Sequence, residues 1–158
     1  MRSFKTLGLL FILGSGILTS VMLTRFEQKR CRQAEGFLAL VRHVRLQIDC
    51  FSLPVPRILE TLPSQIRTAC HIPPNVCDFG ALLTQTPLLL PEEVTELLHA
   101  FGRDLGSSYR EDQLRLCDYY ITRLSPHCER IRADLARKSR LALALPLAAA
   151  AALALLLI

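Results

Sequence analysis

The residues best suited to chemistry are six cysteines and four histidines, several of which are close neighbours in the sequence. Cys70 and His71 are adjacent, Cys77 follows shortly afterwards, and His127 precedes Cys128. Such side chains hold structural zinc when they come in pairs at Cys-x2–4-Cys spacing, and this sequence contains no such pair. We therefore expect no metal site, no cofactor and a structural role for most of these thiols. A metal-binding or thiol-redox membrane protein is the alternative.

The sequence also lacks the usual motifs of catalysis and nucleotide binding. It has no G-x-S-x-G elbow, no P-loop and no dinucleotide-binding glycine set. Glu92, Glu93 and Glu96 stand together, but acids in the first turn of a helix are stabilised by the helix dipole and need no further role. We expect a protein that is not an enzyme, has no catalytic residue and takes no small-molecule substrate.

Two uncharged stretches enclose the middle of the chain. Residues 6–24 contain no charged side chain, and residues 141–158 contain only Leu, Ala, Pro and Ile. A helix of about 20 apolar residues crosses the hydrocarbon core of a bilayer. The predicted segments are a tail at 1–5, a transmembrane helix at 6–24, a cytosolic helical domain at 25–140 and a second transmembrane helix at 141–158.

The net charge of +5 comes from basic residues beside these two stretches. Nine Lys and Arg residues flank them on the side of the middle domain, against two on the amino-terminal side. Because flanking positive residues stay in the cytoplasm, we expect residues 25–140 there, with reduced thiols. Residues 33–129 hold eight Arg and twelve acids, so we expect no nucleic-acid partner.

Apolar spacing within the middle domain predicts helices and no strands. Apolar residues recur every three or four positions over 37–51, which indicates an amphipathic helix that continues directly from the first span. Prolines divide the next segment into short helices at 56–62, 64–70 and 75–83.

The next helix is expected to begin at Pro91 and to end at Gly106, since glycine is common just past the end of a helix. Ser108 and Glu111 then have the spacing of a capping box, in which the serine hydroxyl accepts from the first turn of the following helix.

The most regular pattern lies in the helix before the second uncharged stretch. Apolar side chains step by three and four residues along one face, as in heptad repeats, and Tyr120 lies outside this seam. Pro126 falls within it and is expected to bend the helix near 122–125. The residues of the seam are Leu114, Cys117, Ile121, Leu124, Cys128, Ile131 and Leu135.

These patterns together predict an all-α fold. We expect a cytosolic helical bundle in which two long helices pair antiparallel through 37–51 and 114–135. Short helices would close its far end, and transmembrane helices would flank it at both termini.

Residues 101–113 resemble the F-G-x-x-L-G-x-S-D-x-x-x-Q signature of stage III sporulation protein AB, with Tyr109 at the acidic position. Arg32-Gln33 and the segment Phe51–Pro54 also resemble that family's first cytosolic helix and its turn. The residues that match the signature are Phe101, Gly102, Leu105, Gly106, Ser108 and Gln113.

The resemblance implies a domain similar in fold to the cytosolic domains of type II secretion F proteins. It implies a non-enzymatic scaffold in the mother-cell membrane around the forespore, within the secretion-like complex that joins the two cells. The implied partners are the membrane and other stage III sporulation proteins, with the sporulation ATPase as a further candidate. A generic double-anchored helical adaptor is the other alternative.

Overall fold

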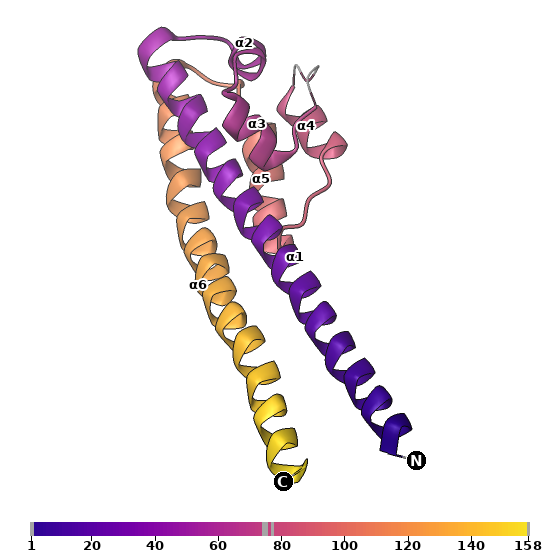
Figure 1. The fold of residues 1–158 in the computed structure, drawn as a ribbon. Helices are drawn as coiled ribbons and strands as arrows, with labels where there is room; N and C mark the ends of the chain where they lie inside the picture. Colours follow the sequence, from indigo (N-terminus) through magenta and orange to yellow (C-terminus); the bar gives the residue numbers. More distant parts are fainter. Residues whose placement is uncertain (1, 74–75, 77, 158) are drawn as a thin grey trace. The chain divides into compact units, whose positions relative to one another are not determined.

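The computed structural model describes residues 2–73, 76 and 78–157, with side chains for Leu18, 21–73, 76 and 78–140. No strand occurs in these residues, so the prediction of an all-α fold is confirmed. The helices are α1 (Arg2–Phe51), α2 (Val55–Glu60), α3 (Ser64–Cys70), α4 (Phe79–Gln85), α5 (Glu92–Asp104) and α6 (Arg110–Leu157) (Figure 1).

The helix bounds agree with most of the expectations from spacing. α1 is one uninterrupted helix, and α3 has the predicted bounds. α2 starts and ends slightly earlier than predicted, with Pro56 in its first turn, where a missing N–H costs no hydrogen bond. α4 starts at Phe79 because the Asp78 carboxylate accepts a hydrogen bond from the Ala81 amide at 3.2 Å. The start predicted at residue 75 lies outside the described residues.

The chain divides into two compact units. The helical unit is Arg30–Ile131, and the terminal unit combines Met1–Lys29 with Arg132–Ile158. The helical unit lies within the domain predicted at 25–140 and contains the core that positions the candidate site.

Within the helical unit, α1 and α6 lie side by side and antiparallel (Figure 1). The thiol of Cys128 donates to the carbonyl of Ala34 at 3.4 Å. Nearer the other end, Arg45 donates to both carboxylate oxygens of Asp118 at 2.5 and 3.2 Å. The contacting residues of α6 have lower residue numbers as those of α1 have higher ones, which is the pattern of two antiparallel helices. The predicted antiparallel pair is therefore present in this unit.

An aromatic cluster joins α4, α5 and α6. The Phe101 ring packs edge-on against Phe79 at a centroid distance of 5.1 Å and against Tyr120 at 5.3 Å. Gly102 allows this approach, because a Cβ atom there would lie 2.8 Å from Phe79 Cδ1. The buried rings of Phe79 and Phe101 make α5 a fixed support for the turn that follows it.

A buried glutamine fixes the connection between α4 and α5. Gln33 of α1 is fully buried, and its side-chain amide donates to the Pro87 carbonyl and accepts from the Leu89 amide, both at 2.8 Å. Both polar ends of the amide are therefore paired with loop backbone that would otherwise lack partners inside the core.

The buried face of α6 differs from the predicted seam. Cys117, Leu124, Cys128 and Ile131 are buried as expected, whereas Leu114, Ile121 and Leu135 are only half-buried. Gln113 and Tyr120, which the apolar pattern leaves out of the seam, are both 5% exposed. The exclusion of Tyr120 was wrong, because α5 packs on that side of α6 and its Phe101 covers the tyrosine ring.

Pro126 does not end α6, which remains helical on both sides of it. Upstream of Pro126, the hydroxyl of Thr122 donates to the Asp118 carbonyl at 2.8 Å, and that of Ser125 donates to the Ile121 carbonyl at 2.7 Å.

In the terminal unit, Lys138 Nζ of α6 donates to Glu27 Oε1 of α1, which joins the two helices. Within the residues whose side chains the structure describes, no helix is long and apolar enough to cross a membrane. The spans predicted at 6–24 and 141–158 lie outside those side chains, apart from Leu18 and residues 21–24.

Candidate functional site

The turn between α5 and α6 begins with Leu105 and Gly106, and only glycine adopts the backbone conformation of the second position without strain. Leu105 caps α5 with φ −69° and ψ 129°. Gly106 follows with φ +88°, in the left-handed region that L side chains rarely adopt. The prediction that α5 ends at this glycine is therefore confirmed, with Gly106 just past the cap.

Gln113 closes the turn from the first turn of α6. Its Oε1 atom accepts from the Gly106 amide at 3.1 Å, and its Nε2 atom donates to the Ser108 carbonyl at 3.4 Å. One side chain thus binds both ends of the turn. The predicted capping box does not form: in the part of the chain that the structure describes, the Ser108 hydroxyl lies near Ser107 Oγ at 3.5 Å and does not bond to Glu111.

Arg110 binds the start of α6 to the end of α1. Its guanidinium donates to the carbonyl of Asp49 at 2.6 Å, to the Asp49 carboxylate at 2.9 Å and to the carbonyl of Ile48 at 3.3 Å. The last carbonyls of a helix have no partner within it, and a positive charge there also suits the helix dipole. The α1–α2 turn and the α5–α6 turn are therefore held together.

These two turns enclose an open hollow of about 350 Å³. Its wall includes Ser52, which directly follows the last residue of α1 and has φ +50°. Apolar side chains from the α1–α2 turn form one side, and polar groups of the α5–α6 turn form the other. The lining residues are Ile48, Ser52, Leu53, Pro54, Val55, Pro56, Gly106, Ser108, Arg110 and Gln113.

A second hollow of about 680 Å³ lies between α5 and α6. His127 Nδ1 lies 3.5 Å from the Glu93 carboxylate, and Glu96, His99, Arg103 and Arg123 share the wall with two apolar side chains. No group of three or more potential metal ligands occurs among the described residues. This open wall with charges of both signs differs from the enclosed, mainly apolar lining of a small-molecule pocket.

Two of the buried thiols, those of Cys70 and Cys117, are poorly placed for nucleophilic chemistry. Burial raises the pKa of Cys70 to about 12 and that of Cys117 to about 11, which disfavours the reactive thiolate. None of the described cysteines is in a disulfide, and among them only Cys50 is exposed. Cys77 lies outside the described residues.

The structure divides the six signature residues between two tasks. Phe101 and Gly102 face the aromatic cluster, while Gly106, Ser108 and Gln113 line the first hollow and Leu105 caps the helix between them. Sequence reasoning missed Arg110. The sequence signal that could have found it is a basic residue in the first turn of a helix, because acids are favoured there and a basic residue needs another reason. Sequence reasoning also missed the role of Gln33, which has no local signal.

Comparison with known proteins adds one finding. Residues 82–158 match the family model described as stage III sporulation protein AB. The matched range contains α5, the braced turn and α6, and hence all six signature residues. No curated protein and no solved structure matches the chain.

Proposed function

Because residues 82–158 match the family model described as stage III sporulation protein AB, we propose that this chain is a member of that family and acts in sporulation as a non-enzymatic membrane scaffold. In this role it presents the helical unit to other proteins of the complex that joins mother cell and forespore. The observation that carries the proposal is the position of the signature residues in the fold. Leu105, Gly106, Ser108 and Gln113 form and brace a turn beside an open hollow, which is a surface for contact.

The chemistry of the described residues supports a role without catalysis. Ser108 is the one hydroxyl of the signature, and the hydrogen-bond contact of its Oγ atom is with Ser107 Oγ at 3.5 Å rather than with a base, while the amide of Gln113 braces the turn. Burial raises the pKa of the Cys70 and Cys117 thiols, which favours their protonated form. A scaffold needs rigid surfaces and fixed angles between helices, and Gln113, Arg110 and Gly106 supply these.

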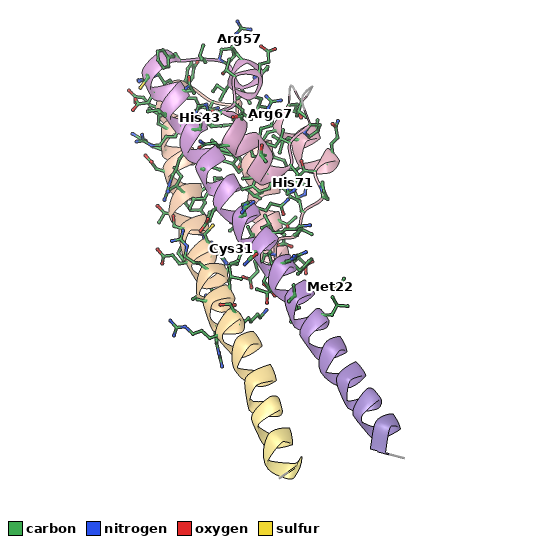
Figure 2. All side chains as sticks on the ribbon, in the orientation of Figure 1. Met22, Cys31, His43, Arg57, Arg67 and His71 are labelled. Atoms are coloured by element: carbon green, nitrogen blue, oxygen red, sulfur yellow. The ribbon has the colours of Figure 1, made fainter. Side chains whose placement is uncertain are left out.

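Exposed apolar residues at the start of the described side chains support membrane anchoring. Val21, Met22 and Leu23 are 44, 65 and 56% exposed, and Leu18 is 61% exposed. Met22 projects away from α1 in Figure 2. Consecutive residues of a helix point about 100° apart, so Val21, Met22 and Leu23 expose apolar side chains around more than half of the helix. An apolar surface this wide is typical of a membrane span, whereas a surface helix of a globular protein exposes a polar face.

The proposed orientation places the helical unit in the cytoplasm of the mother cell, from the excess of flanking positive residues. Cys50 offers a test, because it is exposed while the other described cysteines are buried. In a Cys77→Ser background, an impermeant maleimide should label the protein only after the cells are permeabilised. Cys50→Ser should remove that signal. Labelling of Cys50 in intact cells would mean that the helical unit faces the opposite side of the membrane.

The scaffold function is tested at the turn. Gly106→Val forces a β-branched residue into the left-handed region and should cost more than about 1 kcal/mol, whereas Gly106→Asn should cost less, because asparagine adopts a positive φ more readily than other L residues. In a complemented deletion strain, we expect Gly106→Val to lower the count of heat-resistant spores at least about tenfold while the protein remains in the membrane fraction. Gly106→Asn should stay close to the wild type.

His71→Ala and His127→Ala serve as controls for chemistry in the same strain. Each should leave the spore count close to that of the wild type, because neither side chain contributes to the turn. Loss of spores in these variants, together with normal sporulation of Gly106→Val, would favour the metal or redox alternative over the scaffold.

A further inference from the structure

The contact between Lys138 and Glu27 fixes the level at which α1 and α6 meet in the terminal unit. Lys138 Nζ donates to Glu27 Oε1, and the Glu27 side chain is 6% exposed. A buried carboxylate that accepts from an ammonium group resists separation, because either charge alone would lack its partner. The segments around residues 27 and 138 therefore lie beside each other.

Four further cations surround this pair, and we call them the basic collar. Arg25 and Lys29 lie two residues to either side of Glu27 on α1, while Arg137 and Arg140 lie close to Lys138 on α6. All four are exposed, and within the described residues none has a hydrogen-bond or ion-pair partner. At 1.5 Å per residue, the two pairs span about 6 and 4.5 Å along their helices.

The charge of the collar is not balanced by its own unit. Glu27 is engaged by Lys138, and Asp134, one turn before Lys138, is the other acid among the described residues of the terminal unit. Exposed apolar side chains begin at the same level, since Phe26 is 47% exposed and Leu23 and Met22 follow toward the amino terminus. Cations therefore meet apolar surface within one turn of helix.

We propose that the basic collar binds the headgroups of anionic phospholipids. The interfacial layer of a bilayer leaflet is about 5–7 Å thick, which matches the height of the collar. Three of its four cations are arginines, and guanidinium groups bind phosphate oxygens through two parallel hydrogen bonds. Adjacent apolar side chains favour a lipid over a soluble polyanion, since they would enter the acyl region below the headgroup. The inference rests on the membrane anchoring proposed above.

The test uses the full chain in detergent and native mass spectrometry. Phosphatidylglycerol and phosphatidylcholine with the same acyl chains are added in equal amounts, and the bound populations are compared. We expect phosphatidylglycerol to be retained preferentially. Each basic residue near a membrane surface contributes about 1 kcal/mol, or roughly fivefold in binding, so the double variant R137Q/R140Q should reduce phosphatidylglycerol binding by roughly 25-fold.

The matched control is R42Q/R115Q, which removes two exposed arginines from the helical unit and lowers the net charge equally. It should bind phosphatidylglycerol as the wild type does. Equal losses in both double variants would mean that total charge attracts the lipid, and would overturn the collar. Equal retention of both lipids by the wild-type chain would overturn it as well.

Alkaline extraction of cell membranes separates this inference from the proposed anchoring. If the protein remains in the membrane pellet at high pH but shows no lipid preference, only the collar proposal fails. If it is released by alkali, the anchoring fails, and the collar proposal fails with it.

Discussion

Gln113 holds Gly106 across the turn between α5 and α6, with the glycine amide donating to the glutamine Oε1 atom at 3.1 Å. The glutamine is 5% exposed, and its other end donates to the Ser108 carbonyl. A backbone conformation open mainly to glycine is thus paired with a side chain seven residues later that satisfies its amide. The angle between α5 and α6 depends on both residues together.

Replacement of Gln113 by leucine should therefore destabilise the protein. The change removes both hydrogen bonds and leaves the Gly106 amide without its acceptor, at an expected cost of about 1–3 kcal/mol. Thermal unfolding of the full chain in detergent measures it. Gln85→Leu is the matched control, because Gln85 is exposed at the end of α4 and should change stability by less than about 0.5 kcal/mol. Equal effects would mean that the brace contributes nothing.

Tyr120→Asp should be more destabilising than Ile121→Asp. The tyrosine ring lies against Phe101, its hydroxyl donates to Asp104 at 3.0 Å, and an aspartate there would bury a charge near a second carboxylate. The expected loss is several kcal/mol, against a smaller one at the half-buried Ile121. Tyr120→Phe, which removes only the hydroxyl, should cost about 1 kcal/mol. A larger loss of stability for Ile121→Asp in the same unfolding assay would mean that Ile121 is the buried residue, as the heptad seam predicts.

The contact between Gly102 and Phe79 predicts coupling between two substitutions. Gly102→Ala places a methyl group 2.8 Å from Phe79 Cδ1 and should cost about 1–3 kcal/mol of stability. In a Phe79→Leu background the added methyl has more room, so its cost should fall. A double-mutant cycle should give a coupling energy of about 0.5–3 kcal/mol. If the stability losses of Gly102→Ala and Phe79→Leu simply add in the double mutant, the two residues do not interact and the contact is excluded.

The stability of the helical unit should fall in mild acid because of His43. Burial lowers the pKa of His43 from its ordinary 6.5, and its buried Nε2 atom has no hydrogen-bond partner in the described structure. Below pH 6.5 the unfolded chain binds this proton more readily than the folded one, so the free energy of unfolding decreases as pH falls toward the lowered pKa. Denaturant titrations at several pH values measure the slope. His43→Gln should flatten it, whereas His99→Gln, on an exposed residue, should not.

The sequence was sufficient for the long elements and for one feature of the site. Uninterrupted helical pattern predicts α1 through residue 51, and Gly106 marks the end of α5 because few other residues fit its backbone. The register of α6 was not predictable by counting apolar residues, since Tyr120 and Gln113 are buried with their polar atoms paired. The role of Gln33 was also hidden, because its partners lie 54 and 56 residues away.

The contact of Arg110 with the end of α1 has a consequence for biosynthesis. The carbonyls that it satisfies lie 61 and 62 residues earlier in the chain. A ribosome adds about 5–20 residues per second, so the end of α1 waits roughly 3–12 s for its partner. During that interval α1 carries apolar residues that are buried in the finished fold, including Leu40, Val41 and Val44, before α6 has been made. Apolar surface exposed at this stage of synthesis favours aggregation until α6 is complete.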